Sequence, residues 1–159
     1  NGLRIQEKIC YVLSNTTGFH LALAKSSGRN LESKRTTGPY NENDFDILRV
    51  YLFCKVDELG KVSFKRECYN IKYNGKNYQP AIEDIKSYTL FGYFDIPMKK
   101  LISEGWVSTK NQKGKTGLSV FLPEKIAEIH YSLPKKILKN TPIWTREYFN
   151  LCMDLNKLN

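Results

Sequence analysis

Residues 45–56 read FDILRVYLFCKV and give the strongest strand signal in the chain. Branched aliphatic and aromatic side chains follow one another there with few polar interruptions. Such a run is typical of a strand that is covered on both faces of its sheet. We therefore expect this segment to be a strand that is buried on both faces.

The residues before this strand predict three elements. Apolar positions at helical spacing predict a short helix over 5–13, and FHLALAK predicts a strand over 19–25. Residues 26–43 hold Ser, Gly, Asn, Thr and Pro with hardly any apolar side chain, which predicts a long polar loop.

The residues after it predict further strands and two hairpins. The strands are expected over 62–66 and 87–94, and the hairpins over 69–78 and 106–122. The turn of the first hairpin is Asn-Gly, which tolerates the positive φ angles of a tight turn, and the tip of the second is rich in lysine.

Three helices are expected in the second half of the chain. Pro97 and Gly105 bound the first, and the others cover 123–132 and 141–155, with Thr141 as the cap of the last. Strands followed by short helices predict an α+β or mixed α/β fold, with residues 1–159 as a single domain.

The composition favours a partner that is a polyanion. The chain has 159 residues, and 25 Lys and Arg against 16 Asp and Glu give a formal net charge of +9 at pH 7. Plentiful aromatic and aliphatic residues exclude a disordered or acidic solvating protein. Nucleic acid is the commonest partner of a chain with this charge.

The number and spacing of the cysteines and histidines exclude a zinc site of the usual kind. The four cysteines form no C-x-x-C pair, and His20 and His130 are the only histidines, so no zinc spacing can be assembled. No apolar run approaches the roughly 20 residues of a membrane span, and no secretory signal is visible. We expect a reduced, cytoplasmic protein.

Basic residues cluster in three polar segments, at 25–35, 110–115 and 135–139. Cations beside Ser, Thr, Asn and backbone amides are the groups that contact phosphates. Together with two lysines of the helix after Pro97, the predicted DNA-binding residues are Arg29, Lys34, Arg35, Lys99, Lys100, Lys110, Lys113 and Lys115.

Residues 19–66 resemble nucleases of the PD-(D/E)XK class, the restriction-endonuclease-like proteins. The strand LALAK ends at Lys25, SSGR and TTGPY follow, and NDFDIL at 43–48 opens the next apolar strand. In many members of that class a strand ends in an acid-x-Lys or Gln-x-Lys pair. A polar stretch with Arg or Lys and a Pro-Tyr follows, and then a strand that opens with Phe-Asp.

The resemblance implies a restriction-endonuclease-like central sheet with flanking helices and a basic β-hairpin. It implies Mg²⁺-dependent cleavage of double-stranded DNA in a restriction or phage-defence context, by a homodimer or a larger restriction complex. Lys25 would position or activate the attacking water. Asp46 and Asp44 would be the catalytic carboxylates and the metal ligands, since Mg²⁺ prefers oxygen donors and lowers the pKa of bound water.

The expected metal ligands depart from the pattern of the class. Leu23 stands where an acid is expected two residues before Lys25, and no aspartate precedes Asp44. The site is therefore either rebuilt from Glu42, Asp44 and Asp46 or degenerate, in which case the domain only binds DNA.

Two alternatives to a nuclease stay open. The first is a non-catalytic DNA-recognition domain of a restriction or defence system, either a β-rich specificity domain or a winged helix. In a winged helix, Lys99 and Lys100 would lie at the major groove and the 110–115 loop would be the wing. The second is a basic protein-interaction module, which would show no salt-dependent affinity for DNA.

Overall fold

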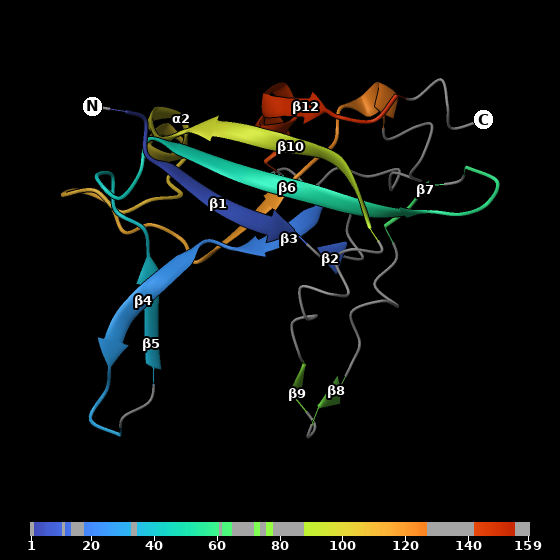
Figure 1. Ribbon diagram of the computed structural model, residues 1–159. Coiled ribbons are helices and arrows are strands. Elements are labelled where there is room, and N and C mark those ends of the chain that lie inside the picture. The colour runs from blue at the N-terminus through green and yellow to red at the C-terminus, as the bar shows by residue number, and fades with distance from the viewer. Residues whose placement is uncertain are drawn as a thin grey trace.

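The apolar run at 45–56 forms β6 (Ile47–Val56), an inner strand of the largest sheet in this computed structural model (Figure 1). The buried face of β6 holds Leu48, Val50, Leu52 and Cys54. The expected burial on both faces is wrong, because the other face is half-buried and carries charge. There the guanidinium of Arg49 pairs with the carboxylate of Asp95 on the neighbouring strand at 2.6 Å.

The structure describes residues 2–10, 12–13, 18–32, 35–60, 62–64, 72–73, 76–77, 88–126 and 142–154. Within them, the central sheet has the strand order β1-β6-β10-β12, and β7 also pairs with β6. The strands beside β6 are β1 (Ile5–Cys10), β7 (Val62–Ser63), β10 (Thr89–Pro97) and β12 (Phe149–Leu151). The described part of the chain confirms a mixed α+β fold class.

The first strand, β1, stands where a short helix was expected, and that expectation is wrong. It runs parallel to β6, with Ile5 beside Ile47 and Cys10 beside Leu52. Residues four apart, such as Ile5 and Ile9, share a face in a strand as well as in a helix, so their spacing suits both. Hydrogen bonding to the edge of β6 decides in favour of the strand.

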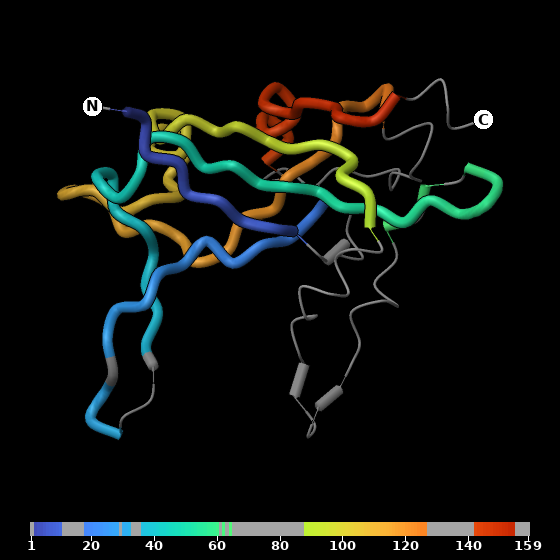
Figure 2. Tube along the Cα trace, in the orientation of Figure 1, coloured from blue at the N-terminus to red at the C-terminus, as the bar shows by residue number. Residues whose placement is uncertain are grey.

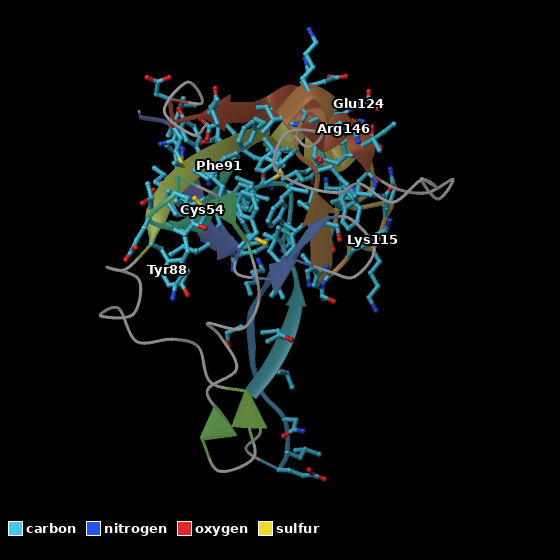
Figure 3. The ribbon with its side chains drawn as sticks, turned by 90° about the vertical axis from the view of Figure 1, so that its right-hand side faces the viewer. Cys54, Tyr88, Phe91, Lys115, Glu124 and Arg146 are labelled. Carbon is cyan, nitrogen blue, oxygen red and sulfur yellow. The ribbon has the colours of Figure 1, made fainter. Side chains whose placement is uncertain are left out.

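A second, smaller sheet has the order β11-β3-β2 and consists of β11 (Gly117–Val120), β3 (Phe19–Ala22) and β2 (Val12–Leu13). The strand expected at 19–25 is confirmed, with an interruption at Leu23. The hairpin expected between 106–108 and 118–122 is wrong, because β11 pairs with β3 instead. Buried side chains of both sheets form one core, and Figure 3 places Phe91 and Cys54 in its interior.

The helix expected after Pro97 is confirmed as α2 (Met98–Ser103), which buries Met98 and Leu101. Gly105 follows it at a φ of +74°, a conformation that glycine adopts without strain. The residues directly before α2 form the nine-residue strand β10. A winged-helix module has a helix pair in that place, so the described residues do not support that alternative.

Of the helix expected over 141–155, residues 143–148 are helical and residues 149–151 are not, within the described residues 142–154. The chain forms the 3-10 helix η2 (Ile143–Tyr148) and then β12, which pairs with β10. At Gly92 of β10, a Cβ atom would lie only 2.5 Å from the carbonyl oxygen of Asn150. The missing side chain thus lets the two backbones approach closely.

The Asn-Gly hairpin is confirmed by β8 (Lys72–Tyr73) and β9 (Lys76–Asn77), which pair antiparallel. Of the helix expected over 123–132, residues 124–126 are helical and the rest lies outside the described residues, as does the basic group at 135–139. No helix in the described part of the chain is long and apolar enough to cross a membrane.

Candidate functional site

Residues 24–29 and 35–39 form a two-stranded arm, where a polar loop was expected over 26–43. The strands β4 (Ala24–Arg29) and β5 (Arg35–Pro39) pair antiparallel, and the arm extends away from the two sheets (Figures 1 and 2). The loop expectation is wrong because the backbones of the two strands pair, and hydroxyl groups rather than apolar side chains add contacts between them. The Ser27 hydroxyl donates to Thr36 Oγ1 at 3.0 Å, and that hydroxyl donates to the carbonyl oxygen of Gly28 at 3.1 Å.

Residues 108–116, which we call the lysine loop, hold both ends of the arm. The Leu23 N–H, just before β4, donates to the carbonyl oxygen of Thr116 at 2.9 Å. Just after β5, the Ser108 N–H donates to the carbonyl oxygen of Tyr40 (2.7 Å), and the Glu42 N–H donates to that of Ser108 (3.0 Å). The lysine loop therefore lies at the base of the arm, although residues 40–107 separate the two in sequence.

The lysine loop presents its three lysines to solvent. Lys110, Lys113 and Lys115 are all exposed, and the ammonium of Lys115 lies 4.2 Å from the centroid of the Trp106 ring. Figure 3 shows Lys115 at the outer edge of the molecule. In the part of the chain that the structure describes, none of the three has a carboxylate within ion-pair distance.

The loop is held in shape by a close backbone contact at Gly114. Its N–H donates to Ser108 Oγ at 2.9 Å, and a Cβ atom at this position would lie 2.6 Å from the Ser108 nitrogen. Across the turn, the Thr109 N–H donates to the carbonyl oxygen of Gln112 at 2.9 Å. These contacts fix the backbone from which the three lysine side chains extend.

The predicted basic residues of the arm are placed only in part. Arg29 and Arg35 lie directly opposite each other in the register of β4 and β5. Lys34 lies outside the described residues. The exposed hydroxyl residues Ser26, Ser27 and Thr37 share the arm with them. Hydroxyls and cations on one ribbon are both types of group that contact a phosphate backbone.

Lys25 contacts Asp44, the second of the two carboxylates expected beside it. Its ammonium donates to the two carboxylate oxygens at 2.7 and 2.5 Å, and the Asn41 N–H donates to the same carboxylate at 2.6 Å. Partial burial raises the pKa of Asp44, but the hydrogen bonds from Asn41 and Lys25 outweigh it and hold the pKa below its usual value. The aspartate is therefore ionised at neutral pH and ties the first strand of the arm to residues 41–44.

Asp46, the first candidate, is held by a different cation. Arg4 donates to it from Nε at 3.2 Å, from Nη2 at 3.0 Å and from its backbone N–H at 2.8 Å. The hydrogen bond from the Arg4 side chain is the main reason that the pKa of Asp46 is lowered. Sequence patterns gave no sign of Arg4, whose position depends on the pairing of β1 with β6.

This arrangement does not fit the magnesium site that the resemblance implies. Both candidate carboxylates already accept hydrogen bonds from a cation, and Leu23, in the place of the expected acid, is fully buried in the core. The described residues contain no group of three or more His, Cys, Asp or Glu side chains placed to hold a metal. We therefore derive no catalytic step through a metal.

The two lysines of α2 differ from each other. Lys99 is exposed, whereas the ammonium of Lys100 lies 2.7 Å from Glu104 and 5.2 Å from the centroid of the Trp144 ring. The pKa of Lys100 is raised, chiefly by its hydrogen bond to Glu104. Lys100 thus fastens α2 to η2 and is less available to a partner than Lys99.

Comparisons with known proteins bear on the fold. No protein-family model matches the chain, and no curated protein matches its sequence. The structure is similar to the crystal structure of MepB, with a TM-score of 0.53 and 17% sequence identity, over 92% of this chain and 70% of that chain. At this level of identity the likeness concerns the fold alone, and the chain shares its overall fold with MepB.

Proposed function

We propose that this protein binds double-stranded DNA through one surface made of the arm and the lysine loop. The observation that carries the proposal is the set of backbone hydrogen bonds by which the lysine loop holds both ends of the arm. Two basic segments that are distant in sequence therefore adjoin in space. Spatial clustering of cations is the electrostatic footprint that nucleic acid requires.

The distribution of ion pairs supports this location. Arg4, Lys25, Arg49 and Lys100 each pair with a carboxylate, which neutralises them locally. The lysines of the lysine loop have no such partner in the described part of the chain. Lys110, Lys113 and Lys115 are exposed and therefore remain open to phosphates. Neutralising phosphates with such cations releases counterions, which drives binding.

The shape of the arm suits a groove of the duplex. A two-stranded ribbon has its strands about 4.8 Å apart and is narrow enough for the major groove, which is roughly 12 Å wide. Six residues of β4 reach about 20 Å from the base of the arm. An isolated ribbon is only marginally stable in water, so contacts with a partner would also stabilise the arm itself.

The restriction-endonuclease-like core and Mg²⁺-dependent cleavage remain finer predictions that rest on the resemblance. The contact of Lys25 with Asp44 supports the expectation that this lysine lies beside an acid, while the engagement of Asp46 by Arg4 weighs against a shared metal site. Binding is therefore the function that we propose, and incubation of supercoiled plasmid with the protein and Mg²⁺ tests cleavage separately.

Salt dependence tests the proposal directly. We expect fluorescence anisotropy with a 20-base-pair duplex to show log affinity falling linearly with log salt. The slope should be about −3 to −5, because up to six cations of the arm and lysine loop each contribute about −0.9. Polyglutamate of matched charge is the control for an acidic protein partner. Absence of duplex binding at 50 mM salt, or tighter binding to polyglutamate, would overturn the proposal.

Gly114→Ala tests the geometry without changing any charge. The new Cβ atom would lie within 2.6 Å of backbone atoms of residues 107 and 108, so the lysine loop must move. We expect duplex affinity to fall severalfold in the same anisotropy assay. Gly38→Ala, on β5, is the matched control, since its nearest neighbour would be 3.8 Å away and affinity should not change. Equal affinities for the two variants would show that the shape of the loop is irrelevant.

A further inference from the structure

Trp106 lies next to the lysine loop, and its backbone is held on both sides. It follows Gly105 just after α2, and its N–H donates to the carbonyl oxygen of Leu101 at 2.8 Å. Its own carbonyl oxygen accepts a hydrogen bond of 3.1 Å from the Lys115 N–H. Two residues further on, Ser108 holds the end of the arm. The indole ring therefore has a fixed place beside the proposed DNA-binding surface.

The Trp106 ring lies between the core and a lysine. It packs against the core and is only partly buried, and the ammonium of Lys115 lies over it, 4.2 Å from the ring centroid. Among the residues that the structure describes, no carboxylate lies within ion-pair distance of Lys115. The contact of an exposed ammonium with an aromatic ring is weak. A phosphate can therefore draw this ammonium away from the ring.

The other tryptophan of the chain, Trp144, shows a different arrangement. The ammonium of Lys100 lies 5.2 Å from the centroid of the Trp144 ring, and the same ammonium pairs with Glu104 at 2.7 Å. The carboxylate holds this lysine in place and repels an approaching phosphate. Only the ring of Trp106, of the two tryptophans, is thus covered by a lysine that no described carboxylate holds.

The groups around the Trp106 ring indicate the chemistry of its ligand. Lys110, Lys113 and Lys115 are exposed cations of one loop, so they attract an anion and repel a cation. The flat face of an indole ring stacks on another flat aromatic group. A ligand that joins a phosphate to an aromatic ring is a nucleotide. A base inside a duplex has both faces covered by its neighbours, whereas an unpaired base offers a free face for stacking.

We propose that Trp106 is a stacking site for an unpaired base of the bound DNA, and that Lys115 leaves the ring to contact the adjoining phosphate. This inference rests on the proposed DNA binding and specifies which DNA the surface prefers. Stacking of a base on an aromatic side chain is stronger than the contact of an exposed ammonium with that ring, so the exchange is favourable. Duplexes with unpaired nucleotides at one end should therefore bind more tightly than blunt ones.

Three 20-base-pair duplexes test the stacking site. One is blunt, one has a three-nucleotide overhang, and one has an overhang of three abasic nucleotides, which adds the same phosphates without bases. In the Trp144→Phe variant of the whole chain, tryptophan emission comes from Trp106 alone. We expect the overhang with bases to quench this emission. In anisotropy, it should bind roughly tenfold more tightly than the abasic overhang, with the same salt slope.

Two variants of Trp106 supply the comparison. In Trp106→Phe the remaining emission comes from Trp144, and we expect it to be the same with both overhangs. Trp106→Leu removes the stacking ring and should bind the two overhangs equally, whereas Trp144→Phe should keep the preference. Circular dichroism checks that Trp106→Leu is folded. The quenching measurement leaves Trp106 in place, so it does not depend on that variant.

The outcomes separate the stacking site from the proposed function. Equal quenching by the overhangs with and without bases, or a preference that persists in Trp106→Leu, would overturn the stacking site but leave DNA binding intact. Equal quenching by free nucleoside monophosphate at the same nucleotide concentration would overturn the assignment to a base within a DNA strand. Absence of wild-type binding to all three duplexes at low salt would overturn the proposed function itself.

Discussion

Replacing Lys110 and Lys113 together with alanine is expected to weaken duplex binding by up to about 60-fold at 0.1 M salt. Each counterion released on contact with a phosphate contributes a factor of roughly 8 at that concentration, and two contacts would be lost. The salt slope should become shallower by up to about 1.8. Because phosphate contacts do not depend on sequence, the loss should be similar for duplexes of any sequence.

Lys55 and Lys125 supply the charge-matched control. Both are exposed, and Lys55 lies near the end of β6 that is distant from the arm (Figure 1). Their double replacement with alanine removes the same net charge, and we expect only a small change in affinity and slope. If the two double variants lose affinity equally, binding depends on net charge alone, and the surface that we assign to the arm and lysine loop is wrong.

The largest effect on stability is expected for Phe91→Ala. The Phe91 ring is fully buried and lies edge-on to Phe64 with 4.9 Å between centroids, and 6.0 Å from Phe149. Removing it loses burial and leaves a cavity, which costs about 3–5 kcal/mol of unfolding free energy. Domains of this kind have about 5–15 kcal/mol in total. The melting temperature should fall by roughly 6–20 °C in calorimetry.

Phe53→Ala separates burial from the loss of an aromatic ring. Phe53 lies on the half-buried face of β6, so the same substitution removes less buried area and should cost about 1–2 kcal/mol. Urea titrations of the two variants give the comparison. Similar destabilisation by both would mean that the core does not lie where the two sheets meet.

Strong local sequence patterns correctly predicted the elements whose structure depends little on distant parts of the chain. The apolar run of β6, the pairing of β8 with β9, and α2 between a proline and a glycine all formed where expected. Weak sequence patterns gave wrong predictions where pairing with a distant strand determines the secondary structure. Residues 5–10 and 149–151 were expected to be helical, but both lie along edges of the central sheet, where backbone hydrogen bonds to β6 and β10 outweigh local preference.

The candidate site shows the same dependence on distant pairing. Lys25 was expected beside Asp46 or Asp44, and the structure brings it to Asp44. Asp46 is engaged by Arg4, which lies just before β1, and misreading β1 as a helix hid that contact. The joining of the arm to the lysine loop could not be read from sequence, because it consists of backbone hydrogen bonds that leave no pattern of side chains.

The pairing of β3 with β11 has a consequence for how the chain is made. Ala22 pairs with Gly117, so β3 must wait for about 95 further residues to leave the ribosome. At roughly 5–20 residues per second, this takes on the order of 5–20 s. The strands of the arm, between Ala24 and Pro39, are complete well before the segment that anchors them exists. Because an isolated two-stranded ribbon is only marginally stable, the arm is secured only when residues 108–117 emerge, and the late arrival of β11 sets that time.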